Sequence, residues 1–186
     1  MAAAGAASAA GRVSEESWRA FAERVVETLD VGPGTTVFDI QCGAGAFLFP
    51  LAENDYAVGG LDPSAALIKQ AAAAMPSGRW SVGPAATMDP GEAWDVVVAV
   101  SAFASFKDLD EARGVLARMM AKAEHAIAIL DVPEGRGGPD LQSIQYERAW
   151  MLHSLAEIGA SAVQIEDQRL DGDPLAASRF NVFARV

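Results

Sequence analysis

The chain of 186 residues has few of the side chains that build disulfides or thiolate metal sites. It has one cysteine, Cys42, and two histidines, His125 and His153. A lone cysteine forms no disulfide within the chain, and this set is too small for a Cys/His zinc cluster. We therefore expect no metal site, and a chain without disulfides is typical of the reducing cytoplasm.

Positive charge is also scarce. The chain has 14 Lys and Arg against 25 Asp and Glu, which gives a net charge of −11, and its basic residues form no run. Binding to nucleic acid or to anionic membrane surfaces depends on clustered positive charge. No apolar run reaches the roughly 18 residues of a membrane span. The sequence therefore predicts neither a nucleic-acid partner nor a membrane partner.

The first 13 residues are mostly Ala and Gly. They lack the positive start and the Leu-rich stretch of an export signal. Because small side chains bury little surface, we expect a disordered tail over 1–13. The remainder, 14–186, has the length of a single domain.

Strand and helix patterns alternate from Ser14, which is placed to cap a helix that ends before Gly32. Pro63 suits the first position of a later helix, and Gly159 suits the end of the last one. Strands are predicted at 36–40, 56–62, 79–83, 94–100 and 126–132, later helices at 46–54, 63–75, 108–123 and 141–158, and closing strands at 161–170 and 178–186. This order predicts an α/β, Rossmann-like three-layer sandwich: a seven-stranded, mostly parallel sheet with an antiparallel C-terminal hairpin.

Ligands of such sheets bind beyond the carboxyl ends of the strands. The stretch DIQCGAG follows the first strand, and Gly43 and Gly45 permit a sharp turn close to a ligand. Leu48 stands where the dinucleotide fingerprint has its third glycine. Asp62 ends the second strand, 19 residues beyond Gly43, where a carboxylate accepts both ribose hydroxyls. Asp62 is equally placed to cap the helix at Pro63, and one residue can do both.

Four stretches in this order and spacing, VFDIQCGAGAFLFPLAE, GLDPS, WDVVVAVSAFASFKD and AIAILD, resemble the class I S-adenosylmethionine-dependent methyltransferases. The resemblance covers about 15–186, and the end of the chain is similar to small stand-alone methyltransferases of natural-product or polysaccharide gene clusters. It implies one methyltransferase domain over 14–186, S-adenosylmethionine as cofactor and S-adenosylhomocysteine as product.

The resemblance also implies roles by position. The carboxyl at the end of the first strand contacts the methionine amino group, the glycine loop passes beneath the cofactor, and the end of the second strand holds the ribose and adenine. Backbone after the third strand borders the adenine, and the end of the fourth lies near the methionine part. The residues implied are Asp39, Gln41, Cys42, Gly43, Ala44, Gly45, Asp62, Pro63, Ala85, Ala86 and Ser101.

Three positions depart from the family pattern. Gln41 stands where the family has a small residue, and Pro84 stands where an acidic residue contacts the adenine amino group. Pro84 is expected to weaken cofactor affinity, and Gln41 either crowds the cofactor and weakens its affinity or adds a polar contact to it. Ala104 and Ser105 replace a frequent histidine pair, which removes a familiar general base.

Methyl transfer to a hydroxyl needs alignment and gains from a general base. The catalytic candidates are Asp131, at the end of the fifth strand, and the helix face formed by Tyr146, Trp150 and His153. The alternative is that this face is the core side of an amphipathic helix, and that Asp131 is a turn residue before Pro133.

The favoured function is methylation of a small-molecule acceptor, at a hydroxyl of a metabolite or sugar. One alternative is a catalytically degenerate binding module that acts through a partner, and another is an NAD(P)-dependent oxidoreductase, which the absent third glycine weakens. With no large insertion in the chain, the acceptor site would be built from the N-terminal helix, the loop 133–140 or a partner subunit. An open cleft or a homodimer is therefore expected.

Overall fold

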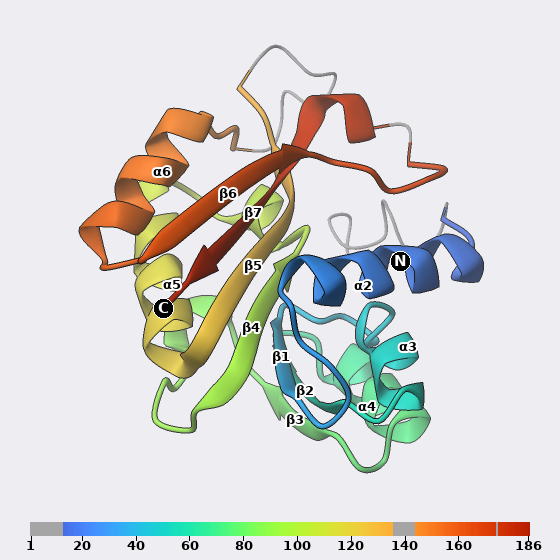
Figure 1. The fold of residues 1–186 in the computed structure, drawn as a ribbon. Helices are drawn as coiled ribbons and strands as arrows, with labels where there is room; N and C mark the ends of the chain where they lie inside the picture. Colours follow the sequence, from blue (N-terminus) through green and yellow to red (C-terminus); the bar gives the residue numbers. More distant parts are fainter. Residues whose placement is uncertain (1–12, 136–143, 174) are drawn as a thin grey trace.

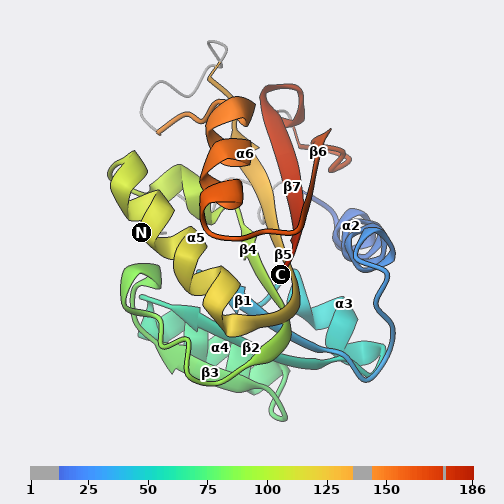
Figure 2. The same cartoon turned by 60° about the vertical axis from the view of Figure 1, so that its left-hand side comes forward.

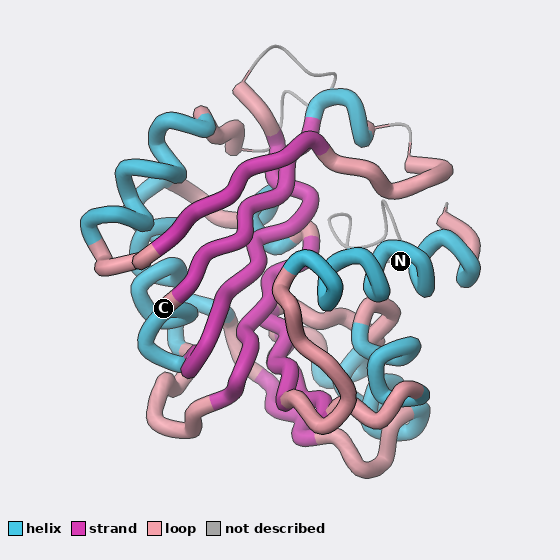
Figure 3. Tube along the Cα trace, viewed as in Figure 1, coloured by secondary structure: helices cyan, strands magenta, loops and turns pink. Residues whose placement is uncertain are grey.

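The computed structural model describes residues 13–135, 144–173 and 175–186. In this part of the chain seven strands form one sheet in the order β3-β2-β1-β4-β5-β7-β6 (Figures 1 and 3). The first five strands in this order, from β3 through β2, β1 and β4 to β5, are parallel to one another. Strand β7 is antiparallel to both β5 and β6. The predicted fold class is confirmed. The strands are β1 (Thr36–Ile40), β2 (Ala57–Asp62), β3 (Arg79–Val82), β4 (Trp94–Val100), β5 (Ala123–Pro133), β6 (Ala162–Asp167) and β7 (Arg179–Arg185).

Helices cover both faces of the sheet, with α2, α3 and α4 on one face and α5 and α6 on the other (Figures 1 and 2). The helices are α2 (Glu15–Thr28), α3 (Leu48–Glu53), α4 (Ala65–Ala74), α5 (Leu109–Lys122) and α6 (Arg148–Glu157), with short 3-10 turns η1 (Ala85–Thr87), η2 (Ala102–Ser105) and η3 (Ala176–Ser178). Within the described ranges, no helix combines the length and apolar character needed to cross a bilayer.

Each face of the sheet has its own apolar core. Successive strand residues point to opposite faces, so Val96 and Val98 pack beneath α2 and α3 while Val97 and Ala99 pack beneath α5. Because the central strands are buried on both faces, their sequences are continuous apolar runs rather than alternating ones.

The N-terminal helix begins as predicted, because Ser14 Oγ accepts a hydrogen bond from the Ser17 amide at 3.1 Å. Most of the predicted tail lies outside the described residues. Val13, which was assigned to that tail, is buried at 8% exposure and belongs to the same core cluster as Trp18. The two stand at the positions of a hydrophobic staple, so the domain begins at least one residue earlier than predicted.

The long helix predicted over 141–158 is wrong at its start. Residues 141–143 lie outside the described residues, and α6 begins only at Arg148. The amide of Tyr146 donates to the Pro133 carbonyl at 2.8 Å, and its carbonyl accepts from the Gly135 amide at 3.0 Å. Because these backbone groups form a bridge to the end of β5, they are not available to a helical turn.

Candidate functional site

The loop after β1 turns through three left-handed residues. Gln41, Gly43 and Gly45 have φ angles of 57°, 57° and 83°. The Gly45 amide closes the turn on the Cys42 carbonyl at 2.9 Å, and the side chain of Ala44 is exposed. Glycine adopts these angles without strain, whereas glutamine does so at a cost of about 1 kcal/mol. The sequence pointed to the two glycines, but it gave no indication that Gln41 is left-handed.

Asp62 ties this loop to the end of β2. Its Oδ2 accepts the Gly43 amide at 2.9 Å, and its Oδ1 accepts the Ser64 amide at 2.8 Å. The cap of α4 is Ser64, whose Oγ accepts the Leu67 amide at 3.4 Å, so the prediction that Asp62 caps a helix opened by Pro63 is wrong. A carboxylate offers about four lone pairs, and Asp62 therefore keeps acceptor capacity for a ligand.

Asp39 lies beside Asp62 and is 2% exposed. Its Oδ1 has no hydrogen-bond partner among the described residues. Burial raises the pKa of Asp39 well above its ordinary value, and the charge of Asp62 adds to this, against a backbone hydrogen bond from Val100 that lowers it. An unpaired buried oxygen is destabilising, so this position favours a ligand that brings a hydrogen-bond donor.

Cys42 fixes the loop against β2. Its amide donates to the Leu61 carbonyl at 3.1 Å. Burial and the charges of Asp39 and Asp62 raise the pKa of its thiol, so Cys42 is a packing residue rather than a nucleophile. A Cβ on Gly60 would lie 2.7 Å from Cys42 Sγ. Gly60 therefore permits the close approach of the loop, a role that the sequence patterns did not single out.

The exit of β4 reaches the same loop. Ser101 is left-handed at φ 57° and begins the turn η2. Ser105, at the end of η2, donates from Oγ to Gln41 Oε1 at 2.8 Å and lies 2.8 Å from the Ala102 carbonyl. The ends of β1, β2 and β4 are thus joined at one edge, as the parallel sheet predicts.

Asp131 lies at the centre of a buried polar cluster at the ends of β4, β5 and β7. Its Oδ2 accepts from Ser101 Oγ at 2.6 Å and lies 3.5 Å from the Arg179 guanidinium, and its Oδ1 accepts from Gln168 at 3.5 Å. The backbone of Asp131 is left-handed at φ 59°, where the β5–β7 register shifts. Its amide donates to Asn181 Oδ1 at 3.0 Å, and its carbonyl accepts from Arg179 at 3.1 Å.

Burial raises the pKa of Asp131, which is 3% exposed, while Arg179 and the hydrogen bond from Ser101 lower it. The net shift is upward, so the carboxylate accepts a proton more readily than an exposed aspartate does. Of this cluster, the sequence pointed to Asp131 and Ser101. Gln168 directly follows β6 and Arg179 begins β7, and alternation along these strands does not show which of the polar residues point inward.

The structure does not bring Tyr146 and His153 together on one helix face. Tyr146 precedes α6 and is fully buried, and its hydroxyl donates to the Phe103 carbonyl at 3.0 Å. Burial raises the pKa of this phenol. The hydrogen bond of its hydroxyl links η2 to the segment that precedes α6. The imidazole of His153 is 69% exposed and lies 3.2 Å from Glu157 on the next turn of α6. The prediction that Tyr146 and His153 share one helix face, on which both catalytic assignments rested, is therefore wrong.

Comparison with known proteins finds one matching family model. Residues 38–123 match the family model described as a methyltransferase domain. The matched residues include the loop after β1, Asp62 and the exit of β4. The match covers just under half of the chain, and it agrees with the class I S-adenosylmethionine-dependent methyltransferases that the sequence resembles. This match favours a methyltransferase over the nicotinamide-dependent alternative. A search of curated proteins finds no match.

Solved methyltransferase structures share the fold. Magnesium protoporphyrin IX methyltransferase from Synechocystis PCC 6803, solved with bound SAM, has a TM-score of 0.69 and 20% identity over 91% of this chain and 80% of its own. An amino pentose methyltransferase of calicheamicin biosynthesis from Micromonospora echinaspora, also bound to SAM, has a TM-score of 0.72 and 18% identity over 91% and 92%. A TehB-like methyltransferase from Corynebacterium glutamicum has a TM-score of 0.67 and 21% identity over 89% and 86%.

Proposed function

We propose that this methyltransferase binds S-adenosylmethionine in the loop after β1 and transfers its methyl group to a hydroxyl of a small metabolite or sugar. The observation that carries the cofactor site is the buried Oδ1 of Asp39, which lacks a partner among the described residues and lies near the loop whose Gly43 amide donates to Asp62. The methionine amino group supplies the donor that Asp39 lacks. The bound cofactor supplies an electrophilic methyl group on a sulfonium.

The remaining contacts follow from the same edge of the sheet. Asp62 accepts the ribose hydroxyls with the lone pairs that its two amide donors leave, and Pro63 packs on the adenine. Of the two alanines in η1, Ala86 is exposed whereas Ala85 is buried in the core, so Ala86 is the better candidate for the adenine rim. Ser101, at the exit of β4, borders the methionine part.

Calorimetric titration tests this cofactor assignment directly. Titrations of the purified chain with S-adenosylmethionine and S-adenosylhomocysteine are expected to give one site each, and a titration with NADH is expected to give no heat of binding. A chain that binds neither sulfur compound would contradict the proposal.

The acceptor assignment rests on Asp131 and Ser101. Ser101 is partly buried at the edge of the site, and its hydroxyl donates to the carboxylate behind it at 2.6 Å. Ser101 Oγ takes the proton of an acceptor hydroxyl as it passes its own proton to Asp131 Oδ2. The raised pKa of Asp131 favours this uptake. A neighbour of similar fold acts on an amino pentose, and another is a putative O-methyltransferase, which supports a small hydroxylated acceptor.

A panel of alcohols, phenols, amino sugars and amines with methyl-labelled S-adenosylmethionine tests the acceptor class. Labelled ethers are the expected products. Asp131→Asn and Ser101→Ala should each lower transfer by about 100-fold or more, and in Asp131→Asn the affinity for S-adenosylhomocysteine should stay within about threefold. Labelled amines as the sole products would contradict the hydroxyl assignment.

A homodimer is the remaining expectation about partners. Light scattering at several protein concentrations tests it, and a mass near 19.4 kDa throughout would make the chain a monomer.

A further inference from the structure

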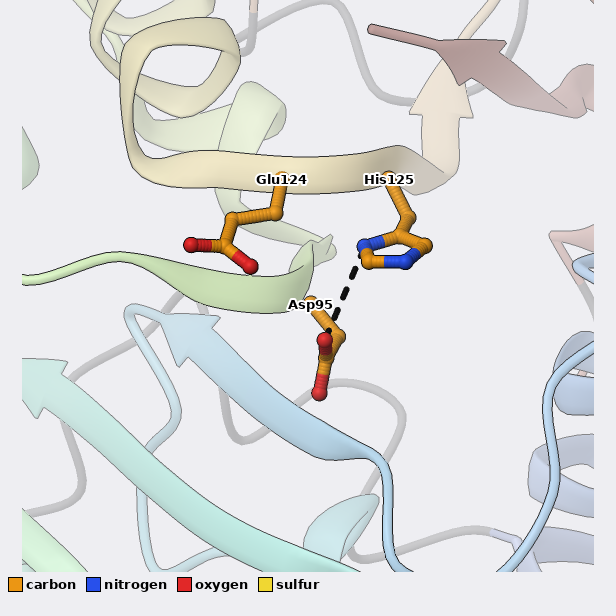
Figure 4. Close-up of side chains that lie close together, drawn as sticks. All are labelled: Asp95, Glu124 and His125. Atoms are coloured by element: carbon orange, nitrogen blue, oxygen red, sulfur yellow. Dashed lines mark ion pairs between the residues drawn. The ribbon is translucent and has the colours of Figure 1, made fainter.

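A second cluster of charged side chains lies at the opposite, amino-terminal edge of the sheet. Asp95 stands at the start of β4, and Glu124 and His125 stand at the start of β5 (Figure 4). One potential ligand atom from each of the three lies within 4.8 Å of the others, and this is the one such group found among the described residues. The cofactor and acceptor residues described above all lie at the other edge.

A β-bulge directs both β5 side chains toward Asp95. Trp94 pairs with Ala123 and Val96 pairs with Ala126, so one residue of β4 faces two residues of β5. In a regular strand Glu124 and His125 would point to opposite faces. The extra residue re-aims one of them, as bulges do near functional positions, and Figure 4 shows both side chains directed to the side of Asp95.

Asp95 is held in place before any ion arrives. Its Oδ2 accepts from the Thr36 amide at 2.7 Å and from Thr36 Oγ at 2.8 Å. Its second oxygen, Oδ1, is the one that faces the imidazole.

The separation of these two groups suits a shared ion better than a direct hydrogen bond. His125 Nδ1 lies 3.6 Å from Asp95 Oδ1, beyond the usual range of a hydrogen bond. Two ligands about 2.0–2.1 Å from one tetrahedral zinc ion are about 3.3–3.4 Å apart, so a small movement of either side chain would admit the ion. Glu124 is exposed and long, so its carboxylate can move the short distance needed to complete the set.

From this geometry we propose that Asp95, Glu124 and His125 bind a divalent transition-metal ion, with zinc as the preferred ion. An imidazole with two carboxylates favours zinc, cobalt or nickel over magnesium and calcium, which prefer oxygen alone. The net charge of −11 attracts cations to the surface. The ion would link the first residues of β4 and β5, and Asp95 would connect it through Thr36 to β1.

The histidine content makes the test selective. The chain has two histidines, and His153 with Glu157 forms an exposed pair at 3.2 Å that offers only two ligands. After dialysis against a chelator, calorimetric titration of the full chain with zinc chloride should give one equivalent of bound zinc. His125→Gln and Glu124→Gln should each weaken the binding at least about tenfold, and His153→Gln should leave it unchanged.

A measurement without variants gives a second readout. Only one of the two imidazole Cε1–H signals in the NMR spectrum should shift during the zinc titration, and it should be the signal that is lost in His125→Gln. Loss of zinc binding in His153→Gln instead would overturn the proposal. So would unchanged binding in His125→Gln, the absence of binding at one equivalent, or a preference for calcium over zinc.

Discussion

Asp39 and Asp131 are both buried aspartates at the same edge of the sheet, and burial raises the pKa of each. Their surroundings differ. Asp39 keeps an oxygen without a partner, whereas both carboxylate oxygens of Asp131 have partners within 3.5 Å. The comparison teaches that burial alone does not define a role: the unpaired oxygen is suited to a ligand, and the paired carboxylate is preorganised by the protein itself.

The largest expected effect comes from removing the positive charge beside Asp131. Arg179→Met leaves a buried carboxylate without its guanidinium, and we expect the free energy of unfolding to fall by about 3 kcal/mol at pH 7. The loss should shrink at pH 5, because a protonated Asp131 needs no counter-charge. Urea unfolding at both pH values measures this.

A second variant checks that the loss arises from the charge of Asp131. Asp131→Asn added to Arg179→Met should recover part of the stability, since the amide carries no charge. A loss below about 1 kcal/mol in the single variant at pH 7 would show that the guanidinium and the carboxylate are not closely coupled.

The next effect concerns the carboxylate that ties the loop to β2. Asp62→Ala removes the acceptor of two backbone amides and the proposed ribose contact, so the affinity for S-adenosylmethionine should fall about 100-fold, or about 3 kcal/mol. Calorimetry measures the change. Asp171→Ala, which removes an exposed carboxylate, is the matched control and should bind normally. An unchanged affinity in Asp62→Ala would refute the ribose assignment.

Asp39→Asn should separate stability from function. Above about pH 4 an aspartate ionises readily in the unfolded chain, but the folded chain resists ionisation because its pKa is raised. The contribution of Asp39 to the free energy of unfolding therefore falls as the pH rises from the pKa of the unfolded chain to the higher pKa of the folded chain. The asparagine variant does not titrate and avoids this fall. At pH 7 we expect the free energy of unfolding of the variant to be about 1–2 kcal/mol higher than that of the original chain. Below pH 4 we expect no difference in its favour.

The same substitution should lower the affinity for S-adenosylmethionine about tenfold, because a neutral amide accepts an ammonium group less well than a carboxylate. Denaturant unfolding at pH 4 and pH 7 and calorimetry at pH 7 give the two quantities. An Asp39→Asn chain that is less stable at pH 7 would mean that the native carboxylate is satisfied rather than unpaired.

The smallest expected effect is at Gln41. Gln41→Gly relieves the left-handed conformation and loses the hydrogen bond to Ser105, two changes of about 1 kcal/mol that oppose each other. The affinity for S-adenosylmethionine should change less than about threefold. A gain of tenfold or more would indicate that this side chain crowds the cofactor.

Much of the fold could be predicted from the sequence, because the relevant signals are local. Continuous apolar runs marked β1, β4 and β5, and Ser14 and Asp108 stand at helix caps. Gly43, Gly45 and Asp62 marked the edge of the sheet at which we propose that the cofactor binds. The start of α6 could not be predicted in this way. The Tyr146 backbone bonds to 133–135, more than ten residues earlier, and a non-local bridge leaves no trace in helical periodicity.

By itself, the sequence determined the α/β class, the order of the elements and the place of the glycine-containing loop after β1, since these depend on spacing along the chain. Only the tertiary structure decided that Asp131 is enclosed by Gln168, Arg179 and Asn181, and that Glu124 and His125 both face Asp95. The physical reason is the same in both cases. A β-bulge changes the side to which a residue points, and the pairing of distant strands, not the local sequence, determines where the bulge forms.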